Sequence, residues 1–374
     1  MRTAFTDLMG IEHPLVGFNR SPAVVAEVTN AGGLGVLAAT AYTPEQLDAQ
    51  LTWIEEQTDG RPHGVDLLVP EKVAIGDAGD LVASLRAQIP DVHLEFVERL
   101  MAKYEIPAIP AEATPLVNDE IAAALNPEGA QALIDVALGH PIALIANALG
   151  TPPASLVDNA HERGVIVAAL VGRAKHARRQ VEAGVDVLIA QGTEAGGHTG
   201  TIATTVLTPE VISVAQGRPV LTAGGVASGQ QMAAGLALGA AGVWCGSVWL
   251  NSIEDITPDA IKRKFLSARS SDTLRSPLRT GKPARQLRSA YHDEWEADGL
   301  PALPMPLQPM LVNEAFGRID AAAAEGHAGA LALETFFIGQ VVGAFARLRP
   351  TKEIVESMVS DCDERLRELA AQLR

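Results

Sequence analysis

The chain has 374 residues, of which 47% are hydrophobic and 20% are charged, and these proportions allow a large buried core. Disordered, collagen-like and coiled-coil classes are therefore excluded. The formal net charge of −16 argues against non-specific binding to nucleic acid or to an anionic membrane. Cys245 and Cys362 are too few for a disulfide framework, and residues 1–7 carry no apolar signal core. We therefore expect a cytoplasmic protein.

Short apolar runs, most of them followed by a helix-sized segment, recur along the first two thirds of the chain. They show little polar alternation, as expected for strands that are buried on both faces of a parallel sheet. The predicted strands are Pro14–Phe18, Gly35–Ala39, Gly64–Val69, Pro141–Ala146, Val165–Leu170, Val187–Ala190, Val220–Ala223 and Val243–Cys245. This repeat predicts an α/β fold, a closed (β/α)8 TIM barrel, which takes about 250 residues and leaves about 120 for additional parts.

Helix start signals lie between the predicted strands. Ser21-Pro22 and Thr43-Pro44 each place a hydroxyl residue at the N-cap and a proline in the first turn. The alanine-rich segment Ser228–Gly239 is a further predicted helix. The segment Met232–Leu250 has no charged residue and is nearly long enough to cross a bilayer, but its glycines divide it into the end of that helix and a strand. No membrane contact is expected.

Two stretches interrupt this rhythm. The insertion Pro70–Asn126 follows strand three, is far longer than an ordinary βα loop, and contains a helical pattern around Val92–Leu100. Because βα loops lie on the active-site face of a barrel, the insertion is a candidate lid or pocket wall. The second stretch, 251–330, is predicted to be irregular, and it is proline-rich over Pro301–Pro309. Its basic residues, which would attract an anionic substrate, line a subunit contact or form a solvated face, are Lys262, Arg263, Lys264, Arg275, Arg279, Lys282, Arg285 and Arg288.

Two helices are predicted near the end of the chain, over Leu331–Leu348 and Thr351–Leu373. The second has an apolar stripe that is typical of a core or a dimer contact, so it is consistent with a homodimer. The predicted organisation is an extra C-terminal lobe added to a barrel. The barrel domain comprises 1–250 and 331–374, including the insertion 70–126, and the smaller, substrate-side lobe comprises 251–330.

The most informative segment is Gln191–Gly200, which directly follows the sixth predicted strand and therefore lies on the catalytic face of the barrel. Its glycines let backbone N–H groups approach a flat or anionic ligand closely. Among them is His198, whose side chain titrates near neutral pH. The pattern favours a ligand site with His198 as its acid–base group over an incidental histidine in a turn.

A second motif is divided between two loops. Gly224 and Gly225 follow the seventh strand, and Gly246 and Ser247 follow the eighth. These two loops of a barrel characteristically bind a ligand phosphate through backbone N–H groups. Together, the two motifs predict a phosphorylated, planar cofactor across the barrel mouth. Cys245 is predicted to be a small buried residue rather than a nucleophile. No metal site is expected, because no histidine pair has zinc-site spacing.

The segments Gln191–Gly200, Ala223–Ala227 and Leu238–Ser247 resemble the nitronate monooxygenase family, formerly called 2-nitropropane dioxygenases. The resemblance begins at His13-Pro14, covers most of the barrel, and resumes around Phe337–Gln340. Its motifs are long and specific when taken together.

The resemblance implies a (β/α)8 barrel that holds FMN non-covalently, with His198 as the catalytic histidine. His198 would deprotonate the α-carbon of a nitroalkane or hold the nitro group of a nitronate. The residues implied to contact the flavin ring or its ribityl chain are Gln191, Gly196 and Gly197, and those implied to hold the phosphate are Gly224, Gly225, Gly246 and Ser247.

Two positions depart from the family pattern. After the first strand, the family commonly has a Pro-Met pair and small residues beneath the flavin ring, whereas this chain has Pro14-Leu15, with Gly17 and Phe18 as the cofactor-binding candidates. After the third strand, the family's asparagine is replaced by Asp66. A carboxylate here would change the field near the flavin, so Asp66 is either a structural replacement or a residue that tunes the flavin. The substrate end therefore diverges more than the cofactor end.

The implied reaction is the oxidation of alkyl nitronates or nitroalkanes by molecular oxygen to a carbonyl compound and nitrite, through FMN. Enoyl-ACP reductase II enzymes and NADH:quinone reductases share this barrel and cofactor site, so an NAD(P)H-dependent flavin reductase is the alternative function. A catalytically idle flavin-binding or assembly protein is a third interpretation. The expected partners are a small-molecule substrate and oxygen, with no nucleic acid.

Overall fold

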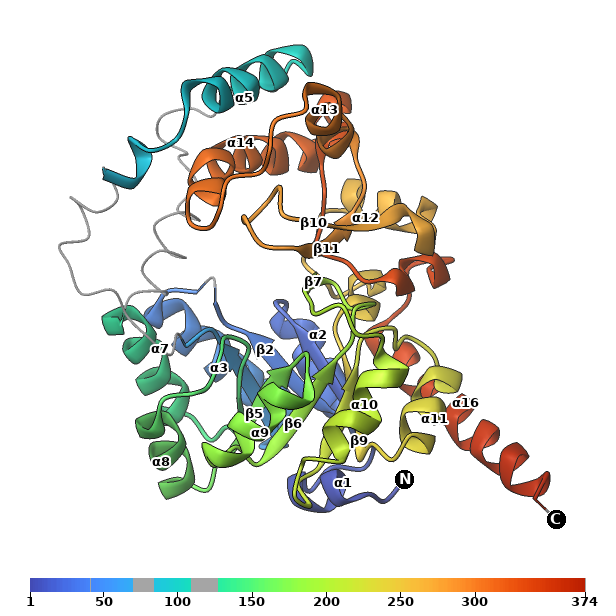
Figure 1. The fold of residues 1–374 in the computed structure, drawn as a ribbon. Coiled ribbons are helices and arrows are strands. Elements are labelled where there is room, and N and C mark those ends of the chain that lie inside the picture. The colour runs from blue at the N-terminus through green and yellow to red at the C-terminus, as the bar shows by residue number, and fades with distance from the viewer. Residues whose placement is uncertain (41, 70–83, 109–126, 374) are drawn as a thin grey trace.

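The computed structural model describes residues 1–40, 42–69, 84–108 and 127–373. Its centre is a closed barrel of eight parallel strands in the order β1-β2-β3-β4-β5-β6-β8-β9 (Figure 1). These strands are Leu15–Asn19 (β1), Leu34–Ala38 (β2), His63–Leu67 (β3), Leu144–Asn147 (β4), Ile166–Val171 (β5), Val187–Gln191 (β6), Val220–Ala223 (β8) and Gly242–Cys245 (β9). The predicted strands and the predicted TIM barrel are both confirmed.

Helices cover the outside of the barrel, and several begin where the sequence predicts. Thr43 caps α3 by accepting a hydrogen bond from the backbone N–H of Gln46, and Ser228 caps α11 in the same way. The segment Met232–Leu250 divides into the end of α11 and β9, and no helix formed by the described residues is long and apolar enough to cross a membrane. The barrel helices are α1 (Ala4–Met9), α2 (Pro22–Asn30), α3 (Pro44–Thr58), α7 (Pro127–Gly139), α8 (Ala154–Glu162), α9 (Ala174–Glu182), α10 (Thr204–Ile212), α11 (Gly229–Ala237) and α16 (Thr351–Ala371).

Strand side chains alternate between the barrel interior and the surrounding helices. On β2, Val36 belongs to the interior cluster, whereas Leu37 belongs to the cluster between strands and helices. On β3, Val65 and Leu67 face the helices, so the alternation turns Asp66 towards the interior. A carboxyl group therefore stands among the apolar side chains that fill the barrel.

A second lobe lies over the mouth of the barrel (Figure 1). It has a hydrophobic cluster of its own, to which helix α5 of the insertion contributes. The ring of Phe96 on α5 lies 4.6 Å from that of Trp295 on α13, measured between centroids. The helix predicted in the insertion is thus confirmed. The rest of the predicted lid or pocket wall, residues 70–83 and 109–126, lies outside the described residues. The lobe elements are α5 (Asp91–Lys103), α12 (Asp259–Ser267), β10 (Thr273–Ser276), β11 (Ala284–Leu287), α13 (Ala290–Asp298), α14 (Leu307–Ala324) and α15 (Ala328–Leu333).

Two predictions for the last third of the chain are wrong. The stretch 251–330 is not irregular, because it contains three helices and the β10–β11 hairpin. The single helix predicted over Leu331–Leu348 does not form. Instead, α15 ends at Leu333, an extended segment follows, and only the short 3-10 helix η4 (Gln340–Ala344) comes after it.

The helix predicted over Leu331–Leu348 does not form because the residues after Leu333 hydrogen-bond to distant parts of the chain. The backbone N–H of Leu287 on β11 donates to the carbonyl oxygen of Phe336, and the N–H of Gln340 donates to the carbonyl oxygen of Glu194. Thr335 also donates its hydroxyl to the carbonyl oxygen of Leu287, at 2.7 Å. These tertiary hydrogen bonds replace the helical ones, although the apolar spacing suits a helix.

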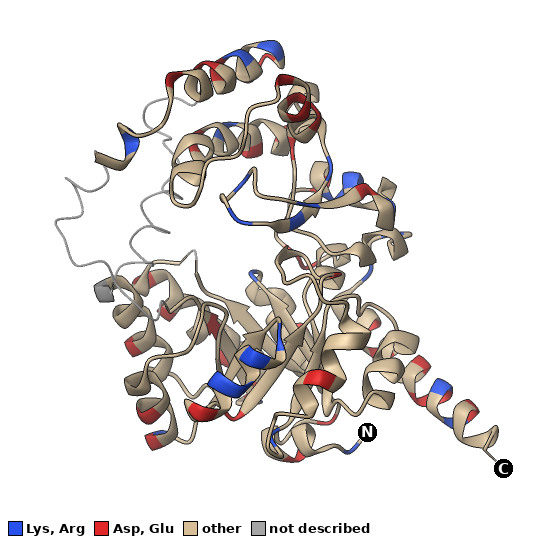
Figure 2. Cartoon of the chain, in the orientation of Figure 1, with Lys and Arg blue, Asp and Glu red and all other residues tan. Residues whose placement is uncertain are grey.

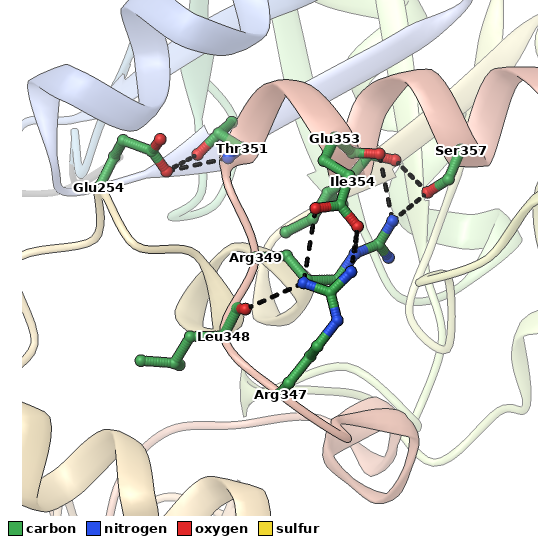
Figure 3. Close-up of polar contacts among 8 residues, drawn as sticks. All are labelled: Glu254, Arg347, Leu348, Arg349, Thr351, Glu353, Ile354 and Ser357. Carbon is green, nitrogen blue, oxygen red and sulfur yellow. Dashed lines mark hydrogen bonds and ion pairs between the residues drawn. The ribbon is translucent and has the colours of Figure 1, made fainter.

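Helix α16 returns to the barrel and packs on α11 and α2. Its first turn is tied to the loop after β9, where the N–H and hydroxyl of Thr351 both donate to Glu254, at 2.9 and 2.8 Å (Figure 3). Glu353 accepts hydrogen bonds from Arg349 and Arg347, and these guanidinium groups lower the pKa of its carboxyl group. The buried part of the predicted apolar stripe, Ile354, Val355, Met358 and Cys362, faces the barrel and is core.

Gly229, the first residue of α11, lies directly against the backbone of α16. A Cβ at this position would lie 2.4 Å from both the backbone nitrogen of Cys362 and the Cβ of Asp361. The contact therefore depends on the absence of a side chain, and the backbone of α16 has to move if one is added.

We expect Gly229→Ala to destabilise the fold by about 1–3 kcal/mol, because an added carbon would push two helices apart. Differential scanning calorimetry would measure this as a lower Tm. Gly139→Ala, at the end of α7, is the matched control, because its Cβ would meet nothing within 4 Å. Equal Tm values for the two variants would contradict the close packing of α11 and α16.

Candidate active site

A cavity of about 310 Å³ opens at the C-terminal ends of the barrel strands, between the barrel and residues 336–341 of the lobe. Phe18 and Trp244 lie side by side in its apolar wall, with ring centroids 5.7 Å apart. The strand residues of this wall are Phe18, Ala38, Leu170, Ala223 and Trp244. A broad apolar wall of this kind suits a planar ring system.

The two loops predicted to hold a phosphate also line the cavity. Gly224 and Gly225 both have positive φ, at 93° and 75°, a conformation that favours glycine and that is found in anion-binding backbone turns. Gly246 and Ser247 line the cavity beside Phe18, which lies 3.5 Å from where a Cβ at Gly246 would be. The Ser247 oxygen accepts a hydrogen bond from the N–H of Gly339 at 2.8 Å. Among the described residues the Ser247 proton meets no acceptor, so it is available to a ligand oxygen.

The glycine-rich segment after β6 packs directly on the extended segment after α15. A Cβ at Gly196 would lie 2.9 Å from the backbone nitrogen of Gly339 and from the Cα of Ile338. Only glycine permits this approach, which places Gly196 and Gly197 in the cavity wall beside Phe337. Gln191, at the end of β6, also lines the cavity.

Glu194 was not predicted as a site residue, and it holds this segment in place. Its carboxylate accepts hydrogen bonds from the backbone N–H and from the hydroxyl of Thr204, at 3.0 and 2.8 Å. The Thr204 hydroxyl also lies 3.0 Å from the carbonyl oxygen of Gly224. Glu194 therefore links the motif after β6 to the loop after β8, a role that no local sequence pattern indicates.

His198 is the second residue of the short strand β7 (Gly197–His198). The described residues that line the cavity include its neighbour Gly197 but not His198 itself, so the predicted catalytic residue lies next to the cavity wall. This strand belongs to the sheet of the lobe, because His198 pairs with Ala284 of β11. The imidazole Nε2 lies 2.8 Å from the Oγ1 of Thr280, and the ring centroid lies 6.2 Å from that of Phe337. Packing of the ring against these groups, and secondly the positive charge of Lys282, lower the pKa of His198.

Two predicted cofactor residues do not line the cavity. A Cβ at Gly17 would lie 2.6 Å from the side chain of Val28, so this glycine faces α2 rather than the ligand space. Asp66 is 3% exposed, and its buried Oδ2 has no hydrogen-bond partner among the described residues. Burial raises the pKa of Asp66 well above its usual range, which favours the protonated carboxyl group. Ala38, its neighbour in register on β2, does line the cavity.

Several cavity residues were missed by the sequence analysis. Arg20 follows β1 directly and stacks over the ring of Phe336, with 5.2 Å between the guanidinium carbon and the ring centroid. Trp244, Phe336 and Phe337 are aromatic residues in a chain that has few. Arg20 could have been predicted from the sequence, because it directly follows a barrel strand. The two phenylalanines could not, because the lobe brings them to the cavity.

Several side chains of the predicted basic run donate hydrogen bonds to backbone carbonyl groups. Arg275 donates to the carbonyl oxygen of Thr199 at 2.8 Å, and Arg285 donates to that of Thr193 at 2.7 Å, so both hold the motif after β6. Lys282 is exposed at the tip of the β10–β11 hairpin. Figure 2 shows Lys and Arg on this hairpin above the barrel, while Asp and Glu colour many of the outer helices. Cys245 is buried, and burial strongly raises the pKa of its thiol, as expected for a core residue.

The residues present fit a flavin nucleotide. The apolar wall suits the ring system, and the backbone N–H groups with the Ser247 hydroxyl, whose proton has no acceptor among the described residues, suit a phosphate. A Cβ at Gly197 would meet nothing within 4 Å, so the space beside this wall residue is open to a ligand. Fold and site together define a (β/α)8-barrel enzyme with a cofactor cavity at the catalytic face of the barrel.

Comparison with known proteins identifies the family. The family model described as nitronate monooxygenase matches residues 2–361, so the chain belongs to the nitronate monooxygenase family. Members of this family are flavin-dependent oxidoreductases, and this chain is an enzyme of that type.

Individual relatives agree with this assignment. A Mycobacterium tuberculosis protein whose name describes a monooxygenase is 51% identical over 365 residues, which cover 96% of each chain. A second protein of that organism, named as a dehydrogenase of an octahydroindene carboxyl-CoA, is 32% identical over 79% of this chain and 69% of its own length. The crystal structure of a nitroalkane oxidase from Streptomyces ansochromogenes has a TM-score of 0.78 and 27% identity, covering 98% of this chain and 100% of that one.

The burial of Asp66 predicts a pH-dependent stability difference. A carboxyl group whose pKa is raised by folding binds a proton in the folded state and loses it on unfolding. It therefore costs stability progressively as the pH rises from the ordinary aspartate pKa towards the raised folded value, by about 1.4 kcal/mol per pH unit. Asp66→Asn removes this penalty, so we expect it to raise Tm at pH 8 and to lose the advantage near pH 4.

Thermal unfolding of the flavin-loaded protein at several pH values would measure this effect. The exposed Asp158→Asn is the matched control, and its Tm is expected to follow the wild type at every pH. A constant difference between Asp66→Asn and the wild type from pH 4 to pH 8 would contradict the raised pKa of Asp66.

Proposed function

We propose that this protein uses FMN to oxidise alkyl nitronates or nitroalkanes with molecular oxygen to a carbonyl compound and nitrite. The observation that carries the proposal is one cavity with an apolar wall and several lining glycines, with His198 next in the chain to the lining residue Gly197. The named nitroalkane oxidase among the structural neighbours, with a TM-score of 0.78, supports this substrate class.

We infer that the Ser247 hydroxyl and the N–H groups of Gly224, Gly225 and Gly246 would hold the FMN phosphate, while the apolar wall would receive the ring. When bound, the flavin would supply the redox chemistry, the transfer of electrons from the substrate to oxygen. The protein binds and orients the substrate and moves its proton.

His198 is our candidate for the base that removes the α-proton of a nitroalkane. Its lowered pKa keeps the imidazole neutral at pH 7, which is the state that a base requires. The neutral nitroalkane needs this step, whereas a nitronate has already lost its proton. The two substrates therefore separate the proton transfer from the oxidation.

The alternative is a flavin reductase that takes hydride from NADH or NADPH. The relative named as a carboxyl-CoA dehydrogenase supports keeping it, because members of this family are not all named for nitronate oxidation. Both functions would use the same cofactor cavity, so the two are distinguished by which compound reduces the flavin.

Anaerobic mixing of the purified flavoprotein with a nitronate, and separately with NADH or NADPH, would test the proposal through the flavin absorbance. We expect rapid bleaching by the nitronate and nitrite release in air, and the heat-released cofactor should co-elute with FMN. His198→Asn should lower kcat/KM for a nitroalkane by about 100-fold or more and have much less effect with the nitronate. Exposed His176→Asn is the matched control.

Bleaching by NADH or NADPH without bleaching by the nitronate would replace the proposal with the reductase alternative. Unchanged nitroalkane turnover in His198→Asn, with FMN retained, would remove His198 as the base.

A further inference from the structure

The hydrogen bonds around His198 define which of its ring nitrogens is free. Nε2 lies 2.8 Å from the Oγ1 of Thr280, in the turn between β10 and β11. No other hydrogen bond of the His198 side chain is found in the part of the chain that the structure describes. Among the described residues, Nδ1 is therefore the ring nitrogen without a hydrogen bond.

The Thr280 hydroxyl has one proton to donate and two lone pairs that accept. Its proton is donated to the carbonyl oxygen of Lys282 at 3.0 Å, and its oxygen accepts from the N–H of Lys282 at 3.4 Å. The remaining lone pair faces Nε2 of His198, so the bond is satisfied when Nε2 carries the hydrogen. The turn thus uses every bonding position of this hydroxyl.

We propose that Thr280 is a positioning residue that holds neutral His198 with its hydrogen on Nε2, leaving Nδ1 as the atom that accepts the substrate proton. The inference rests on the proposed role of His198 as the base. In that step the α-carbon–hydrogen bond breaks, and the proton passes to Nδ1. The electron pair remains with the substrate and is delocalised onto the nitro group, which gives the nitronate.

The same hydrogen bond suits the histidine before and after the reaction. Once Nδ1 has accepted a proton, both ring nitrogens carry hydrogen, and Nε2 still needs an acceptor. Thr280 is already in place as that acceptor. With the opposite tautomer, the hydroxyl would have to reorient before Nε2 could take up a proton.

The charged groups around the ring are consistent with a base that is neutral at rest. Lys282 on the same turn is the charged residue that lowers the pKa of His198. Arg279, also on this turn, lies 5.6 Å from the Phe337 ring centroid, while Arg275 and Arg285 are bonded to backbone carbonyl groups on either side of His198. Glu194, the acidic residue of the same motif, is bonded to Thr204.

Thr280→Val and Thr280→Ser test the proposal, because valine keeps the shape and removes the hydroxyl, whereas serine keeps the hydroxyl. The direct measurement is ¹⁵N NMR of the flavin-loaded protein labelled at histidine, with the His198 signals identified by their loss in His198→Gln. We expect the wild type and Thr280→Ser to show hydrogen on Nε2. Thr280→Val should show a mixture of both tautomers.

The kinetic measurement compares a nitroalkane with its preformed nitronate. Thr280→Val should reduce kcat/KM for the nitroalkane by about tenfold, the equivalent of one hydrogen bond, and leave that for the nitronate within about twofold. Thr280→Ser should restore the nitroalkane rate. An equal loss with both substrates would show a merely structural role for Thr280 and overturn the proposal.

Wild-type His198 with its hydrogen on Nδ1 would also overturn the proposal, whatever the fate of the variants. A wild-type enzyme that bleaches with neither substrate would instead contradict the proposed function, while the NMR result could still be read.

Discussion

The close contact between Gly196 and the backbone of Ile338–Gly339 is the constraint on which the site depends. It joins the loop after a barrel strand to a segment of the lobe at a distance that excludes any side chain on Gly196. The hydrogen bond from the N–H of Gln340 to the carbonyl oxygen of Glu194 and the pairing of β7 with β11 add further contacts between the barrel loop and the lobe. The barrel and the lobe therefore build one cavity, and neither forms it alone.

These contacts between the barrel loop and the lobe explain why a histidine of a barrel loop is positioned by the lobe. His198 follows a barrel strand in sequence, but its backbone pairs with β11 and its ring contacts Thr280 and Phe337. The charge distribution follows the same division. The chain carries a net charge of −16, yet the hairpin beside His198 carries Lys and Arg (Figure 2).

Asp66 and Gly17 show how a departure from a family pattern should be interpreted in three dimensions. Both belong to strands next to the cavity, but Gly17 is small because Val28 on α2 occupies the adjacent space. Asp66 faces the barrel interior, where burial raises the pKa of its carboxyl group. Its neighbour in register, Ala38, lines the cavity, so Asp66 is close to the ligand space. That Asp66 tunes a bound flavin therefore stays a prediction.

The sequence by itself determined the barrel, its eight strands and the loops that carry the site. Strands buried on both faces leave continuous apolar runs, and glycines that must adopt positive φ or approach another backbone leave a local pattern, as at Gly224 and Gly196. Only the tertiary structure decided the course of 331–348, the contribution of Phe336 and Phe337, and the partner of His198. In each case the deciding contact joins residues far apart in the chain, so the local sequence has no pattern that specifies it.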